Sequence, residues 1–261
     1  MPLKGSENFM SNDYRVDYNH DANLHTTAGA EAALAALLPR YQISSLLDVG
    51  AGNGTWLRAA QNAGIKDLQG VDGLQLAQGK LHVLPDLIGY HDLNTPMDLG
   101  RKFDLVISLE VAEHIEPENA HVFVDNLVHH GDIILFAAAC PGQPGTHHVN
   151  CQWPAYWQEK FNAHGFVCSD WPREKLWDNR HIEPWYRQNM FEAKRDAARA
   201  GSEPRLRGMI HPDLVRDLAR SQLPAMVDAI ERGSMPVRWY ATSLVRATGA
   251  KIARRTASLR G

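Results

Sequence analysis

The sequence predicts an α/β protein built on a doubly wound, mostly parallel sheet, with a helical elaboration at its C-terminal end. Short apolar runs alternate with segments of helical spacing through most of the first 170 of the 261 residues. One of these runs, Ser45–Val49, leads directly into a glycine-rich turn. Strands and helices that alternate in this way form a parallel sheet with helices on both faces. After about residue 170 the pattern changes to a tryptophan-rich stretch followed by helix-like segments.

Each predicted element follows from a local pattern. Short apolar runs predict strands over residues 45–49, 68–71, 87–90, 103–109, 132–138 and 166–169. Helical spacing of apolar residues predicts helices over residues 28–38, 55–63, 120–129 and 153–164. Pro39, Gly64 and Gly165 follow three of these helices and are natural helix ends. The apolar run at 103–109 is the strongest strand signal in the chain.

The last third of the chain predicts a different kind of structure. Residues 189–200 are charged and helix-like, and Pro212 opens a further helical segment that we expect to restart at Pro224. Arg187 and Gln188 are expected at solvated positions. We therefore divide the chain into an N-terminal segment (1–27), a sheet domain (28–169) and a mainly helical elaboration (170–261).

Composition excludes several classes of protein. The net charge of −3 gives no overall attraction to nucleic acid or anionic lipid, although seven basic and no acidic residues follow Glu231. No apolar run is long enough to cross a bilayer, and the N-terminus lacks an apolar signal segment. Three cysteines without ligand spacing indicate neither a disulfide framework nor a cysteine-based zinc site. We expect a cytoplasmic protein whose partner is not nucleic acid.

A glycine-rich turn joins the first predicted strand to the next helix. Residues 48–54 read Asp-Val-Gly-Ala-Gly-Asn-Gly. Glycines let a backbone approach a ligand closely, and the helix N-terminus beyond them offers free N–H groups. A dinucleotide fingerprint requires G-x-G-x-x-G, but its third glycine would fall at Thr55. A dehydrogenase or another nucleotide-binding module with a variant loop stays open as an alternative.

Acidic residues also follow the next two predicted strands. Asp72 ends the strand at 68–71, where its carboxylate can accept both hydroxyls of a ribose. Asp92 and Leu93 follow the strand at 87–90. Ligands of open α/β sheets bind at the carboxyl ends of the strands, which is where all these residues fall.

The D-x-G-x-G-x-G turn and the two acids after it resemble those of class I S-adenosylmethionine-dependent methyltransferases. The resemblance covers roughly residues 28–169 and implies a Rossmann-like methyltransferase fold that binds S-adenosylmethionine. It implies that Asp48 orients the loop and the ammonium of the cofactor, that Asp72 binds the ribose, and that Asp92 and the next backbone N–H read the adenine edge. The cofactor-binding residues it implies are Asp48, Gly50, Gly52, Gly54, Asp72, Gly73, Asp92, Leu93 and Leu109.

A second acidic motif, Glu110-Val111-Ala112-Glu113-His114, follows the strongest predicted strand. If a helical turn begins here, Glu110 shares a face with Glu113 and His114. Two carboxylates and an imidazole at the mouth of a pocket suit a divalent cation. Without a cation the carboxylates would repel each other, and one would tend to take up a proton.

This E-x-x-E-H pattern resembles two methyltransferase groups that use a divalent metal, the ubiquinone-pathway O-methyltransferases and the small-RNA 3′-end 2′-O-methyltransferases. In both groups a further histidine comes from a downstream segment, which here is Gly-Thr-His147-His148. The resemblance implies that Glu110, Glu113, His114 and His147 bind Mg²⁺ or another divalent cation, with His148 as a base or as a partner of a ligand. The same motif also occurs in methyltransferases without a metal, where His147 would act as the general base.

These observations predict O-methylation of a hydroxylated small molecule, such as a sugar, a phenol or another secondary metabolite, with His147, His148 and Glu110 as catalytic residues. A metal bound to the acceptor would lower the pKa of its hydroxyl, and the enzyme would then align that oxygen with the methyl group. A metal-independent N- or nucleic-acid methyltransferase and a non-catalytic cofactor-binding module are the alternatives. Neither the acceptor nor the oligomeric state follows from the sequence.

Overall fold

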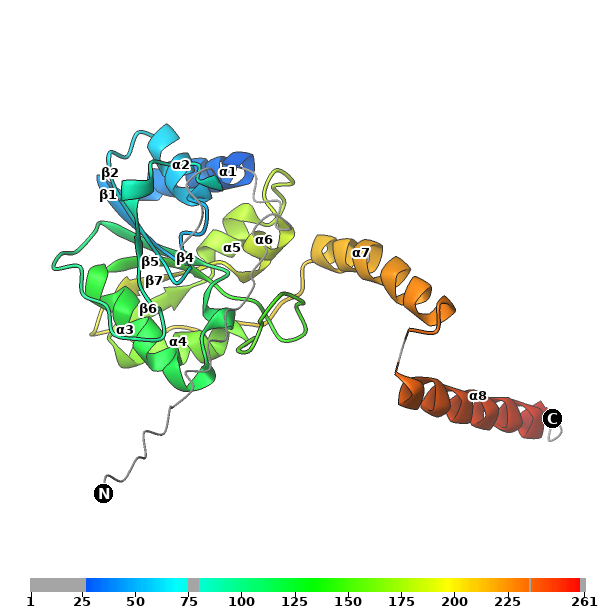
Figure 1. The fold of residues 1–261 in the computed structure, drawn as a ribbon. Coiled ribbons are helices and arrows are strands. Elements are labelled where there is room, and N and C mark those ends of the chain that lie inside the picture. Colours follow the sequence, from blue (N-terminus) through cyan, green and yellow to red (C-terminus); the bar gives the residue numbers. More distant parts are fainter. Residues whose placement is uncertain (1–26, 75–79, 235, 259–261) are drawn as a thin grey trace, which may run out of the picture. The chain divides into compact units, whose positions relative to one another are not determined.

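The computed structural model describes residues 27–74, 80–234 and 236–258 (Figure 1). It consists of two compact units, Met1–His211 and Pro212–Gly261. The predicted N-terminal segment 1–27 lies outside the described residues, apart from its last residue.

The first unit is built on a seven-stranded sheet with the order β3-β2-β1-β4-β5-β7-β6. The strands are β1 (Ser45–Val49), β2 (Asp67–Asp72), β3 (Ile88–Tyr90), β4 (Leu105–Leu109), β5 (Ile133–Ala137), β6 (Phe166–Ser169) and β7 (Phe191–Arg195). Strands β1 to β5 are mutually parallel, and β7 runs antiparallel between β5 and β6. The strand order reverses between β1 and β4, the position at which open α/β sheets bind ligands. The predicted doubly wound, mostly parallel sheet is confirmed.

Helices cover both faces of this sheet. They are α1 (Thr27–Leu37), α2 (Thr55–Asn62), α3 (Ala120–His130), α4 (Pro154–Ala163), α5 (Trp171–Leu176) and α6 (Pro184–Asn189). Alternate residues of a strand point to opposite faces, so Leu46 joins one hydrophobic cluster and Leu47 the other. Helices α3 and α4 pack on the cluster of Leu47, whereas α1, α2, α5 and α6 pack on that of Leu46 (Figure 1).

Two predictions for residues 170–200 are wrong. Residues 191–195 form β7 instead of part of a helix, because this segment fills the space between β5 and β6 and pairs with both. Arg187 and Gln188 are buried instead of solvated, with 3% and 2% of their surfaces exposed. The sheet therefore includes residues beyond 169. The division of the chain into a cofactor-binding domain and an elaboration at residue 169 stays a prediction.

The second unit contains two helices, α7 (Pro212–Glu231) and α8 (Val237–Ser258). The expected restart at Pro224 is wrong, since α7 continues through that residue. Proline already has a helical φ, so it removes one hydrogen bond without forcing a new helix to begin. None of the helices in the described parts of the chain combines the length and the apolar character needed to span a bilayer.

Candidate functional site

The glycine turn lies between β1 and α2, at the carboxyl edge of the sheet. Gly50, Gly52 and Gly54 have φ values of +86°, +52° and +80°, a region that glycine enters without strain. A Cβ atom at Gly50 would lie 2.2 Å from Cγ2 of Val111, and one at Gly54 would lie 2.6 Å from Cγ2 of Val83. The packing of the protein itself therefore accounts for two of the three glycines, a reason that sequence reasoning missed when it assigned them to a ligand.

Asp72 connects the end of β2 to this turn. Its Oδ2 accepts a hydrogen bond from the Gly52 N–H (2.7 Å), and its Oδ1 accepts one from the Leu74 N–H (2.7 Å). A carboxylate oxygen has more than one lone pair, so these bonds fix the orientation of the group and leave acceptor capacity. The expected ribose contact stays a prediction, and the observed role of Asp72 is to hold the turn against β2.

Asp48, near the end of β1, is almost fully buried, with 2% of its surface exposed. Its Oδ2 has no hydrogen-bond partner. Burial, and secondly the charge of Asp72, raises the pKa of Asp48 to about 8. A buried carboxylate without a partner is unfavourable unless a cation or a donor reaches it.

The other predicted cofactor residues lie along the same edge. The carboxylate of Asp92 accepts hydrogen bonds from the backbone and side-chain nitrogens of Asn94 at 3.0 and 3.2 Å, and Asp92 is exposed. Leu93 and Leu109 are buried, and a Cβ atom at Gly73 would be in van der Waals contact with the His91 carbonyl oxygen at 3.8 Å. The structure thus brings these residues to the ends of β2, β3 and β4.

Backbone strain is concentrated in the E-x-x-E-H motif and the downstream histidines. Among the described residues, Glu110 (φ +58°) and His147 (φ +55°) are those other than glycine with a left-handed backbone. Such conformations cost about 1 kcal/mol or more each and cluster at functional sites. Glu110 lies outside the short 3₁₀ turn Ala112–His114, so it does not share a helical face with Glu113.

The two carboxyl groups of the motif lie side by side, with Glu113 buried and Glu110 half-buried. Glu110 Oε1 accepts a hydrogen bond from Asn189 Nδ2 (2.9 Å), and its Oε2 accepts one from Gln143 Nε2 (2.7 Å). Burial raises the pKa of Glu110 to about 7. Burial and then the charge of Glu110 raise the pKa of Glu113 well above its ordinary value. This agrees with the expectation that one carboxyl of the pair takes up a proton.

One imidazole of the cluster differs from the predicted one. Ligand atoms of Glu113, His114 and His148 lie within 4.8 Å of one another. The Nε2 atom of His147 instead lies 3.8 Å from Oε1 of Glu116. His147 turns its carbonyl oxygen toward the cluster, where it accepts a hydrogen bond from His114 Nδ1 (3.2 Å), so the left-handed residue contributes backbone and His148 contributes the side chain.

The environment of His148 keeps its imidazole neutral and oriented. Burial lowers the pKa of His148. Its Nδ1 donates to the Gln143 carbonyl oxygen (3.1 Å), which places the lone pair on Nε2. Its ring lies against that of His114, with centroids 5.0 Å apart. A Cβ atom at Gly145 would lie 1.9 Å from His148 Nε2, so this position has room only for glycine.

Sequence reasoning missed Gln143 and Asn189, which hold Glu110. Gln143 lies in the loop after β5, and Asn189 ends α6, which follows the segment covered by the family resemblance. Amide side chains carry no charge, and Gln143 and Asn189 are not spaced like metal ligands, so no local sequence pattern indicated their role. Only the fold brings position 189 to position 110.

Comparisons with known proteins find similarity in structure alone. No family model and no curated protein matches the chain. Solved structures that resemble it include DesVI of Streptomyces venezuelae (15% identity, 64% of this chain and 92% of that one, TM-score 0.49). Others are the magnesium protoporphyrin IX methyltransferase of Synechocystis PCC 6803 with bound SAH (20% identity, 65% and 82%, TM-score 0.46) and the sugar N-methyltransferase KedS8 of Streptoalloteichus sp ATCC 53650 (17% identity, 65% and 87%, TM-score 0.46). At these TM-scores the likeness carries no argument about reaction or acceptor.

Proposed function

We propose that this chain is an S-adenosylmethionine-dependent methyltransferase. The observation that carries the proposal is the pair of acids at the switch point of the sheet. Asp48 is buried with an oxygen that has no partner, and the charge of the neighbouring Asp72 raises its pKa further. The sulfonium and the ammonium of S-adenosylmethionine would place positive charge where these two carboxylates accumulate negative charge.

The chain offers contacts for each part of this cofactor. Asp48 would face the ammonium, Asp72 would accept the ribose hydroxyls, and Asp92 with the Leu93 N–H would read the adenine edge. When bound, the cofactor supplies an electrophilic methyl group, and the protein orients it and excludes water.

We further propose that a divalent cation binds to Glu113, His114 and His148. The buried Glu113 Oε2 has no hydrogen-bond partner, so a carboxylate oxygen is available beside two imidazoles. Two nitrogen donors and one oxygen donor favour an ion such as Zn²⁺ or Fe²⁺ over Mg²⁺, which prefers oxygen ligands. When bound, such a cation would lower the pKa of an acceptor hydroxyl. This donor set supports O-methylation of a small hydroxylated molecule.

Calorimetric binding of S-adenosylhomocysteine tests the cofactor assignment. Asp72→Asn is expected to weaken binding about tenfold or more, because it removes a charge-assisted hydrogen-bond pair. Asp67→Asn is the matched control, since Asp67 begins the same strand and its side chain is 49% exposed. It is expected to bind normally. Absence of binding to the wild-type protein, together with quenching or enhancement of NADH fluorescence, would favour the dehydrogenase alternative.

Paired histidine variants test the cation site. His148→Gln is expected to reduce Co²⁺ binding about tenfold or more, whereas His147→Gln leaves it nearly unchanged. The two residues are adjacent, so a general loss of fold would affect both variants. The opposite result would restore His147 as the ligand that the sequence predicts.

A further inference from the structure

Helix α6 ends in two buried amides that lead to the Glu110 carboxylate. Gln188 and Asn189 are 2% and 6% exposed. The backbone N–H of His211 donates to Gln188 Oε1 (2.7 Å), and Gln188 Nε2 donates to Asn189 Oδ1 (2.9 Å). Asn189 Nδ2 then donates to Glu110 Oε1 (2.9 Å). The chain of donors therefore runs in one direction, from a backbone amide to the carboxylate.

A third amide closes this chain around Glu110. Asn189 Nδ2 also donates to Gln143 Oε1 (3.0 Å), and Gln143 Nε2 donates to Glu110 Oε2 (2.7 Å). Each carboxylate oxygen of Glu110 thus accepts a hydrogen bond from a side-chain amide. Gln143 also presents its carbonyl oxygen to His148 Nδ1 (3.1 Å). The same residue therefore contacts both the carboxylate and an imidazole of the cluster.

The orientation of these amides is fixed. If the Asn189 amide were reversed, its oxygen would face the acceptor oxygens of Glu110 and Gln143, and its nitrogen would face the donor nitrogen of Gln188. Buried acceptors without donors are unfavourable by about 1–3 kcal/mol each. A reversal at Gln188 is prevented in the same way by the His211 N–H, whose position in the backbone is not adjustable.

This arrangement bears on which carboxylate can bind a cation. Both carboxylate oxygens of Glu110 already accept hydrogen bonds from side-chain amides, which compete with binding to a cation. The backbone of Glu110 is also left-handed. The carboxylate that converges with the imidazoles of His114 and His148 is that of Glu113, which has an oxygen without a partner. Releasing Glu110 would add a second carboxylate and change the donor set.

We propose that Asn189 and Gln143, oriented by Gln188, are positioning residues that hold Glu110 out of the coordination sphere, so that the site has one carboxylate and two imidazole ligands. The inference rests on the proposed cation site. It makes the amides determinants of metal preference: the intact set favours a transition ion, and a set with two carboxylates would bind the harder ions Mg²⁺ and Mn²⁺ better. This differs from the ligand set that the sequence predicts, in which Glu110 is a ligand.

Visible absorption of Co²⁺ tests the proposal, because the intensity and position of its bands report the number and type of ligands. Asn189→Ala and Gln143→Ala are each expected to change the Co²⁺ spectrum and to improve competition by Mg²⁺ about tenfold. Gln158→Ala is the matched control, since this buried amide of α4 donates to Glu203 Oε1 and accepts a hydrogen bond from the Leu206 N–H, away from the cluster. Its spectrum is expected to be that of the wild type.

Ligand variants complete the test. Glu113→Gln is expected to weaken Co²⁺ binding about tenfold or more, whereas Glu110→Gln weakens it about threefold or less. Equal losses in the two variants would make Glu110 a ligand and overturn the proposal, as would an unchanged spectrum in both amide variants. Binding of S-adenosylhomocysteine by each variant reports on its fold and on the cofactor site. A wild-type protein that binds this compound but no Co²⁺ would overturn the inference and leave the methyltransferase assignment standing.

Discussion

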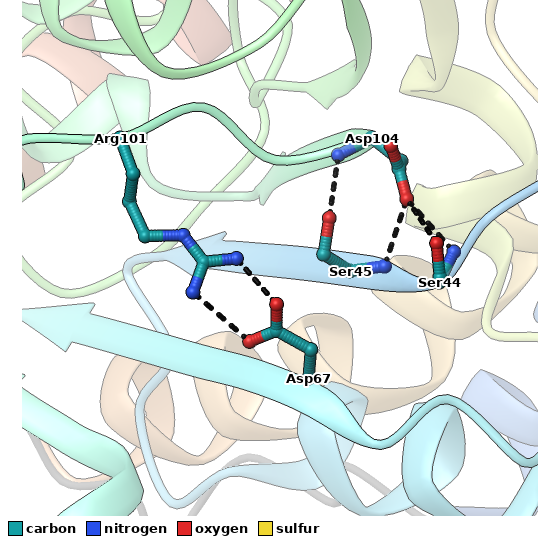
Figure 2. A network of polar contacts seen from close by, with 5 residues as sticks. All are labelled: Ser44, Ser45, Asp67, Arg101 and Asp104. Atoms are coloured by element: carbon teal, nitrogen blue, oxygen red, sulfur yellow. Dashed lines mark hydrogen bonds and ion pairs between the residues drawn. The ribbon is translucent and has the colours of Figure 1, made fainter.

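The acidic residues at the amino ends of the parallel strands differ from those at the carboxyl ends in whether their carboxylate oxygens have partners. At the amino ends, the carboxylates have partners. Asp104 Oδ2 accepts hydrogen bonds from the Ser44 N–H (2.9 Å), the Ser44 hydroxyl (2.7 Å) and the Ser45 N–H (3.0 Å), and Asp67 pairs with Arg101 (Figure 2). Hydrogen bonds from Ser44 lower the pKa of Asp104.

At the carboxyl ends, Asp48 and Glu113 are buried, Glu110 is half-buried, and the pKa values of these three acids are raised. Burial is the largest cause for Asp48, Glu110 and Glu113, and no basic side chain is among the causes for these three. Asp48 and Glu113 each keep an oxygen without a hydrogen-bond partner.

The contrast separates acids whose carboxylates have polar partners from Asp48 and Glu113, each of which has a buried oxygen without one. An acid that is already paired gains little from a further cation, whereas a buried and unpaired acid is destabilising until one arrives. The comparison therefore predicts opposite signs for the same substitution, Asp to Asn, at the two ends of the strands.

The largest expected effect is at Asp48. Because its pKa is raised to about 8 from an unfolded value of about 4, stability is lost as the pH rises between these two values. Asp48→Asn removes this cost, so the free energy of unfolding at pH 8 should increase, on the order of a few kcal/mol. Urea unfolding of both proteins from pH 5 to pH 9 without ligand measures it. A variant less stable than the wild type at every pH would break the comparison.

A histidine at the amino ends should produce an effect of opposite pH dependence. His130 Nε2 accepts a hydrogen bond from the Leu99 N–H (2.9 Å), and burial lowers the pKa of His130. A lowered pKa means that stability is lost as the pH falls below about 6.5, where the unfolded histidine is protonated first. His130→Gln should therefore reduce the acid dependence, with a loss of about 1–2 kcal/mol at pH 7.5.

His121→Gln is the matched control for this prediction. His121 lies on the same helix, α3, and is exposed. Unfolding at pH 5 and pH 7.5 should show the wild-type difference in the control and a smaller one in His130→Gln. Equal pH dependence in all three proteins would remove His130 as the cause.

Asp104 should give a smaller effect with the sign opposite to that of Asp48. Asp104→Asn weakens a carboxylate that accepts three hydrogen bonds, and we expect a loss of about 1 kcal/mol near neutral pH. Because the pKa of Asp104 is lowered, its carboxylate stabilises the fold above about pH 4. This stabilisation is lost as the pH falls further, because the wild-type group is then protonated. Thermal unfolding at pH 3.5 and pH 7 distinguishes the two states. A variant more stable than the wild type at pH 7 would contradict the prediction.

The sheet could be predicted from sequence because its signals are local. Apolar runs, glycine stops and helical spacing lie within a few residues of one another, and the predicted strands from 45–49 to 166–169 agree with the observed ones to within two residues. Strand β7 was missed because its charged residues, Glu192 among them, alternate with apolar ones that face a core assembled from β5 and β6.

The sequence indicated which acidic and histidine residues could form the candidate site, but not which of them contact one another. The motif at 110–114 and the paired histidines identified the cluster. The choice between His147 and His148 depends on a left-handed backbone at position 147, which no neighbouring residue indicates. The amides that hold Glu110 come from positions 143 and 189, and a contact across 79 residues has no local signal.

The smallest expected effect is at the exposed ion pair of the amino ends. Lys102 Nζ lies 2.9 Å from Asp132 Oδ1, and Arg195 Nε lies 2.5 Å from the same oxygen. Lys102 and Asp132 are 53% and 52% exposed, so solvent and salt screen the pair. Lys102→Met should cost about 0.5 kcal/mol or less, because Arg195 still pairs with Asp132, and the difference should disappear in about 1 M NaCl. Urea unfolding at low and high salt measures both. A loss of unfolding free energy above about 1 kcal/mol that persists in high salt would mean that Lys102 stabilises the protein through packing of its aliphatic stem. Ion pairing would then not explain the difference between the acids at the two ends of the strands.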